Sequence, residues 1–176
     1  MASTYSTPGV YIQEISTLPA SIAQVETAIP AFIGNTQTAR KRADNDLHLN
    51  PTRITSMVEF ERMYGRPADE TITVVINTSD EAVVDVTTAA DDRYRMHYAM
   101  QLFFANGGGP CYIVATGSYD EGLSLDTPAD DNDPTTRNHG LSRGLAELTK
   151  ADEPTIIYFP DAVALANADY TSLYNA

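Results

Sequence analysis

The sequence predicts an α/β fold: a mainly parallel or mixed sheet with flanking helices, a β-hairpin insertion and an extended N-terminal strand arm. Three observations lead to this prediction. Apolar β-prone runs alternate along the chain with segments of helical periodicity, the pattern of a layered α/β protein. Two further β-prone runs are joined by a short polar link, as in a hairpin. A β-prone run near the N-terminus has no partner nearby.

The N-terminal run predicts a linking arm over residues 1–22, followed by an α/β domain over residues 23–176. Backbone N–H and C=O groups of a strand need partners, and no second run follows at hairpin distance. We therefore expect the arm to pair with a distant segment or with another chain. The expected inter-subunit strand consists of Pro8, Gly9, Val10, Tyr11, Ile12, Gln13, Glu14 and Ile15.

The α/β domain opens with an apolar run at residues 28–34, which is typical of a buried strand. The spacing of Ser56 and Glu59 then predicts a capping box at the start of a helix, and Gly65 predicts its end. Residues 72–77 and 82–87 form the expected hairpin. Asp91 or Asp92 is expected to cap a second helix that runs to about Ala105.

Four residues after this helix are predicted to form a structural turn: Asn106, Gly107, Gly108 and Gly109. A phosphate-binding glycine loop follows a strand and opens a helix. This run does the reverse, because it closes a helix and precedes a strand at residues 111–115. A turn that needs a positive φ angle is therefore the favoured interpretation.

The C-terminal third begins with an acidic loop over residues 119–138. A helix over residues 140–150 follows, and then residues 155–161, which the sequence predicts to be the most buried strand of the chain. Residues 168–176 have the character of a further helix. We expect the domain to be incomplete at its C-terminal end.

Charge and composition exclude several classes of partner. The formal net charge of −13 argues against nucleic-acid binding. The one basic run, residues 40–42, is short and is interpreted as a solvated loop. With one cysteine the chain lacks a disulfide framework. The N-terminus lacks the pattern of a signal peptide, and no apolar run reaches membrane length, so we expect no direct membrane insertion.

The catalytic signals in the chain are weak. Residues 140–144 match the G-x-S-x-G pattern of serine hydrolases, but they follow an acidic loop, and all three histidines lie before Ser142. The acidic stretch at residues 130–133 lacks the glycine and glutamate positions of a calcium loop. The histidines have no metal-ligand spacing. We therefore expect no enzyme activity, no metal site and no cofactor; a small Rossmann-like α/β enzyme is the least favoured alternative.

Three blocks of sequence together resemble the contractile tail sheath family. The first is residues 7–14 (TPGVYIQE) with the apolar run at 27–34. The second is residues 54–65, where Phe60 and Tyr64-Gly65 are similar to a helix of that family. The third is residues 103–114 (FFANGGGPCYIV).

The chain departs from the family at Ala115, where many members have arginine, and at the hairpin, which has the character of an insertion. Sheath subunits are also about twice this length or more.

The resemblance implies a structural subunit that polymerises helically around an inner tube and contracts to drive the tube through a target envelope. It implies strand exchange between copies through the arm. The implied partners are other copies of the chain, the inner tube protein, and baseplate and terminator or cap proteins. The implied location is the bacterial cytoplasm during assembly, and then a phage tail or tail-like particle that can be released. The alternative is a baseplate, cap or adaptor module of such a particle.

Overall fold

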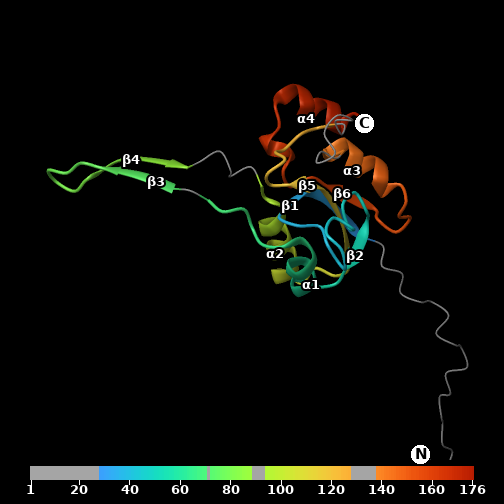
Figure 1. The fold of residues 1–176 in the computed structure, drawn as a ribbon. Helices are drawn as coiled ribbons and strands as arrows, with labels where there is room; N and C mark the ends of the chain where they lie inside the picture. Colours follow the sequence, from blue (N-terminus) through green and yellow to red (C-terminus); the bar gives the residue numbers. More distant parts are fainter. Residues whose placement is uncertain (1–27, 71, 89–93, 128–137) are drawn as a thin grey trace, which may run out of the picture.

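The computed structural model describes residues 28–70, 72–88, 94–127 and 138–176, and it shows a mixed α/β fold (Figure 1). The main sheet has the strand order β2–β5–β1–β6. Strand β1 is parallel to β5 and to β6, whereas β2 is antiparallel to β5. The predicted mixed sheet is therefore confirmed. Its strands are β1 (Pro30–Thr36), β2 (Thr52–Ile54), β5 (Cys111–Ser118) and β6 (Ile156–Tyr158).

Helices cover both faces of this sheet (Figure 1). Helices α1 (Met57–Tyr64) and α2 (Met96–Ala105) pack on one face. Helices α3 (Leu141–Leu148) and α4 (Asn167–Tyr174) pack on the other, together with the 3₁₀ turn η2 (Ala162–Ala164). The described residues thus form three layers, with an apolar core on each side of the sheet.

Side-chain alternation along the central strands divides the two cores. On β1, Phe32 belongs to the core under α1 and α2, whereas Ala31 and Ile33 belong to the core under α3 and α4. On β5, Ile113 and Val114 are divided in the same way. Successive residues of a strand point to opposite faces of the sheet. An apolar run therefore supplies both cores only where the strand is central, as β1 and β5 are.

The start of α1 differs in one detail from the predicted capping box. Ser56 is the N-cap, and its Oγ accepts a hydrogen bond from the Glu59 backbone N–H at 3.3 Å. The Glu59 carboxylate does not return to Ser56. It accepts instead from the backbone N–H and the hydroxyl of Thr55, at 2.8 and 2.9 Å. These hydrogen bonds lower the pKa of Glu59 below its usual value.

Helix α2 begins without a capping side chain of its own. Its N-cap position is Arg95, which makes no side-chain cap hydrogen bond. The expected caps, Asp91 and Asp92, lie outside the described residues. The cap comes from the distant Asp161, whose Oδ1 accepts from the Arg95 backbone N–H at 2.5 Å. The sequence could not indicate this contact, because it joins residues 66 positions apart through a backbone group.

Strands β3 (Ile72–Ile76) and β4 (Val83–Thr88) pair antiparallel as a separate two-stranded sheet. Val74 lies opposite Val86, and a bulge follows Val75. In Figure 1 this sheet projects away from the body of the domain. An isolated two-stranded sheet has little stability of its own in water, so its exposed side chains are candidates for an external contact.

The prediction that residues 155–161 form the most buried strand was wrong. Strand β6 covers only Ile156–Tyr158, and the three residues are 51, 46 and 49 % exposed. The reason is position: β6 pairs with β1 on one side and is the last strand of the sheet among the described residues. A continuous apolar run is typical of a central strand, but this run lies at the edge.

The structure places Asn106 at the C-cap of α2 and gives Gly107 a φ angle of +81°. The Gly108 backbone N–H donates to the Phe103 carbonyl oxygen at 2.9 Å. A Cβ atom at Gly107 or Gly109 would meet no atom within 4 Å, so only backbone conformation distinguishes these two positions. Comparing alanine at these two positions therefore measures the free-energy cost of a side chain at the positive φ angle of Gly107.

Replacing Gly107 with alanine is therefore expected to lower the free energy of unfolding by about 1 kcal/mol, because a Cβ atom disfavours positive φ. Gly109→Ala is the control, and it should change the free energy by less than about 0.5 kcal/mol. Urea denaturation followed by circular dichroism measures both values. Equal midpoints for the two variants would show that the turn does not require glycine at position 107.

Candidate functional site

The most distinctive surface feature is the open edge of the main sheet at β6. Its residues Ile156, Ile157 and Tyr158 are about half exposed and uncharged. Natural proteins protect edge strands with charges, proline, bulges or covering segments. Pro154 and Pro160 flank this strand, but within the part of the chain that the structure describes no charge, bulge or covering segment protects the three residues between Thr155 and Phe159. The edge is therefore suited to accept another strand.

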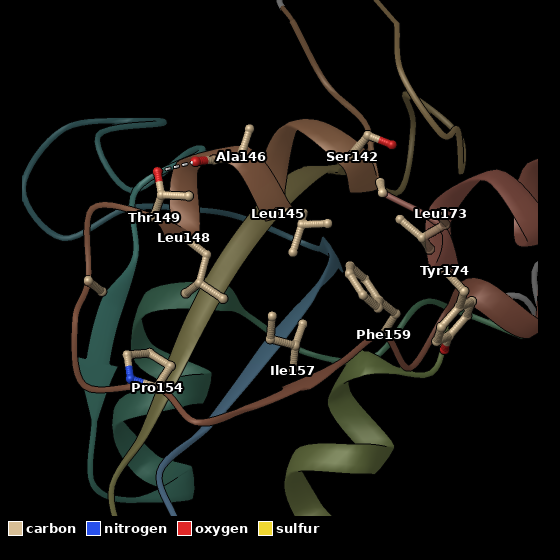
Figure 2. Close-up of a pocket in the computed structure, with 12 residues that line it drawn as sticks. Ser142, Leu145, Ala146, Leu148, Thr149, Pro154, Ile157, Phe159, Leu173 and Tyr174 are labelled. Carbon is tan, nitrogen blue, oxygen red and sulfur yellow. Dashed lines mark hydrogen bonds between the residues drawn. The ribbon is translucent and has the colours of Figure 1, made fainter.

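A large apolar groove lies beside the edge on the face of α3 and α4 (Figure 2). Its volume is about 710 Å³. Figure 2 shows side chains from three elements pointing into one space: α3, the β6 segment and α4. The residues that give the groove its apolar character are Leu145, Leu148, Ile157, Phe159, Leu173 and Tyr174.

A second apolar groove, of about 430 Å³, lies on the opposite face of the same edge. It lies between the C-terminal end of α2 and β6. The Phe32 ring forms edge-to-face contacts with Phe103 and Tyr158, with centroids 5.3 and 5.7 Å apart. Three residues of the predicted turn line this groove: Asn106, Gly107 and Gly108. The turn and the open edge are therefore parts of one surface.

Polar side chains gather where β1 and β5 end, which is the usual place for a site in a parallel sheet. Here they bond to one another. The Thr116 hydroxyl donates to Asn35 Oδ1 at 2.9 Å, and Asn35 Nδ2 donates to the carbonyl oxygens of Ser118 and Gly122 at 3.0 and 2.8 Å. Asp161 accepts from the Asn35 backbone N–H at 3.0 Å. This cluster holds the strand ends together.

A small polar pocket of about 310 Å³ lies near the same strand ends. Two tyrosines line it, and both donate to backbone carbonyl oxygens: Tyr94 to Tyr119 at 2.8 Å, and Tyr119 to Arg66 at 2.9 Å. Burial raises the pKa of Tyr119, with a smaller contribution from the negative charge of Asp161. A protonated phenol that already donates a hydrogen bond is a structural group here, because it is not free to act as a base.

The hydrolase-like residues are explained by packing. Gly140 has a φ angle of +122° at the start of α3, and Ser142 lies in the first turn of that helix. His97 lies on α2, across the sheet from Ser142. His48 Nε2 is instead bonded to the Asn138 carbonyl oxygen at 2.7 Å. The G-x-S-x-G spacing thus marks a helix start.

His97 and Cys111 are buried titratable groups under α1 and α2. Burial lowers the pKa of His97, whose Nε2 lies 3.6 Å from Glu61 Oε1; that carboxylate acts in the opposite direction. Burial raises the pKa of the Cys111 thiol to about 12. A thiol with so high a pKa is protonated and weakly nucleophilic at neutral pH. Both groups therefore act as uncharged core residues.

The expected strand residues Pro8–Ile15 lie outside the described residues. Within the described ranges, no group of three or more His, Cys, Asp or Glu side chains is placed to hold a metal ion. None of the described helices has the length and apolarity to cross a membrane. No protein-family model matches this sequence, and no curated protein matches it.

Sequence reasoning missed two features of this surface. It identified residues 155–161 as apolar and β-prone but placed them in the interior. It also gave no role to Asp161. The flanking residues Pro154 and Pro160 were a signal that this strand lies at an edge, because proline is favoured at sheet edges. For Asp161 the sequence contains no comparable signal, since its partners are backbone groups far along the chain.

Proposed function

We propose that the chain is a structural subunit of a contractile tail sheath, which polymerises around an inner tube and contracts to drive it through a target envelope. The observation that carries the proposal is the open, apolar edge of β6 with a groove on each face. Exposed apolar surface of this kind marks an interaction site in a folded protein. Such an edge is suited to a protein that assembles with other copies of itself. No catalytic role is included in the proposal.

Strand addition is the proposed means of connection between copies. Residues 8–15 of one copy would pair with a sheet of a neighbouring copy, as a donated strand. The six residues 10–15 of this strand span roughly 20 Å when extended, which is sufficient to cross between adjacent subunits. Each backbone hydrogen bond contributes only about 1 kcal/mol, but a polymer repeats the contact at every subunit. Such links would hold the lattice together while it changes shape.

The other partners belong to the same proposal. An inner tube protein, a baseplate protein and a terminator or cap protein would contact the polymer at its inner surface and its two ends. Assembly would take place in the bacterial cytoplasm, and the finished particle would be a phage tail or a tail-like particle. The acidic chain, with a net charge of −13, is suited to protein partners more than to nucleic acid.

Deleting residues 4–14 tests the proposal. The shortened protein should fold and remain soluble, but electron microscopy should no longer show the tubular polymers expected of the intact protein. The physical reason is that the deletion removes the donated strand and leaves the two cores intact. Gln13→Ala within the arm is the control, since backbone pairing does not depend on that side chain, and it should still form polymers.

Hydrogen exchange provides a second measurement on the intact protein. The amides of Val10, Ile12 and Glu14 should exchange fast in the free subunit and slowly in the polymer. Equal protection in both states would contradict strand donation between copies. An intact protein that forms no polymer under any condition would contradict the sheath function itself.

A further inference from the structure

The hairpin formed by β3 and β4 has an apolar face that no other described residue covers. Residues that lie opposite one another point to the same face of a two-stranded sheet. The register Val74↔Val86 and Ile76↔Val83 therefore gathers five aliphatic side chains on one face, each 50–60 % exposed. These five side chains, the apolar hairpin face, are Ile72, Val74, Ile76, Val83 and Val86.

All charges on this hairpin are negative. Asp80, Glu81 and Asp85 are its only ionisable side chains between residues 72 and 88. Asp80 and Glu81 lie at the tip, where Asp80 Oδ1 accepts from the Ala82 backbone N–H at 3.2 Å. Pairing between two copies of the hairpin would bring like charges together, which opposes it. The negative charges of the hairpin therefore favour a partner surface that is basic.

Among the described residues, basic side chains are most concentrated at Arg40, Lys41, Arg42 and Arg62, which lie beside the carboxylates of Asp44, Asp46 and Glu59. We call this group the basic surface. The loop that carries the first three is held by Asp46, whose carboxylate accepts from the backbone N–H groups of Lys41, Arg42 and Ala43 at 2.7, 2.9 and 3.2 Å. These hydrogen bonds lower the pKa of Asp46 below its usual value. Asp46 therefore stays ionised and keeps the loop in the shape that presents its basic side chains.

The loop and α1 contribute to a single surface. The hydrogen bonds from Thr55 are the main cause of the lowered pKa of Glu59. The positive charges of Arg62 and Lys41 also lie close enough to stabilise the ionised carboxylate. Val58 lies one helical turn before Arg62 and is 75 % exposed, so the basic surface includes an apolar side chain. Arg40 pairs with Asp44 at 3.5 Å, whereas the side chains of Lys41 and Arg42 form no direct ion pair with a described carboxylate.

We propose that the hairpin of one copy binds the basic surface of a second copy, with Asp80 and Glu81 against Lys41 and Arg42. The apolar hairpin face would cover Val58. The two surfaces are different parts of the chain, so the contact either repeats head-to-tail from copy to copy or is made twice in a two-fold dimer. It involves neither the arm nor the β6 edge, and it stands whether or not the proposed sheath function does.

Local charge can act here although the whole chain is strongly acidic. At an ionic strength of about 0.1 M the screening length is about 10 Å. Repulsion between the bulk of two copies is then weakened, whereas facing charges at a contact are not separated by that distance. We expect the association to be strongest at moderate salt and to weaken toward about 1 M salt.

Sedimentation velocity of the complete chain tests the proposal with charge reversal. D80K/E81K and K41E/R42E should each weaken association at least about tenfold, because each places like charges in contact. Mixing the two variants restores opposite charges at both kinds of contact, and association should return to within about threefold of the original. This recovery also shows that both variants are folded.

The matched control for D80K/E81K is D152K/D169K, which makes the same change of net charge on exposed residues outside both surfaces. It should associate like the unchanged chain. V74T/V86T tests the apolar face, since threonine keeps a high preference for strands, and it should weaken association without changing charge. A chain that stays monomeric, or variants that do not recover on mixing, would overturn the proposal.

Discussion

Replacing Asp161 with alanine is expected to lower the free energy of unfolding by about 3 kcal/mol or more. The side chain is completely buried, and its carboxylate accepts from the backbone N–H groups of Asn35 and Arg95. Alanine would leave both donors buried without an acceptor, and each such loss costs about 1–3 kcal/mol. The start of α2 would also lose the negative charge at its N-terminus.

Urea denaturation at pH 7 measures this effect. Asp161→Asn retains one acceptor oxygen, so it should cost less than alanine. The control is Asp152→Ala, an exposed aspartate earlier in the same segment, which should change stability by less than about 0.5 kcal/mol. A loss for Asp161→Ala no larger than that control would show that the carboxylate does not hold β1 and α2 together.

The same residue gives a dependence on pH. Burial raises the pKa of Asp161 to about 6, although hydrogen bonds from Arg95, Asn35 and Met96 oppose the rise. The folded chain therefore holds this proton more tightly than the unfolded chain, where the pKa is near 3.8. The contribution of Asp161 to stability is greatest below about pH 4 and falls as the pH rises toward 6.

His97 acts in the opposite direction, since its lowered pKa means that the fold loses stability as the pH falls below about 6.5. The two effects can be separated by measuring the free energy of unfolding of Asp161→Asn and of the unchanged chain at each pH, because His97 contributes equally to both. The difference between the two free energies should change between pH 4 and 6 with a slope of at most about 1.4 kcal/mol per pH unit. A constant difference over this range would contradict a raised pKa for Asp161.

Local patterns were sufficient to predict much of this fold. Strand β5 and helices α1 and α3 were predicted near their observed positions, because each has an apolar pattern and a clear start or stop residue. Strand β2 was not predicted. Its three residues have no apolar run, and they become a strand only because β5 lies beside them. Tertiary pairing can thus create an element without a local signal.

The candidate surface was less predictable than the fold. The composition of residues 156–158 predicts a strand, but whether a strand is central or at an edge depends on what lies on its other side. Asp161 and Asn35 are 126 residues apart, and their bond involves a backbone group that every residue has. Contacts of this kind leave no spacing in a sequence, so a single chain gives no means to foresee them.

Replacing Gly144 with leucine is expected to lower the free energy of unfolding by about 3 kcal/mol, the upper part of the usual range for overpacking. Gly144 is buried where α3 crosses the sheet. A Cβ atom there would lie 2.5 Å from Ile33 Cγ2 on β1 and would also overlap Thr116 Cγ2 on β5. Leucine would push the helix away from both central strands, although glycine is itself a poor helix former.

Ser142→Ala, in the same helix, is the matched control, and it should change the free energy of unfolding by less than about 0.5 kcal/mol. Thermal or urea denaturation of the two variants measures the contrast. If Gly144→Leu were tolerated as well as Ser142→Ala, close packing would not explain this glycine. If the chain were a serine hydrolase, Ser142 would matter more than Gly144, because the serine would be the nucleophile. A hydrolytic activity that Ser142→Ala removes would therefore contradict the packing explanation of these residues.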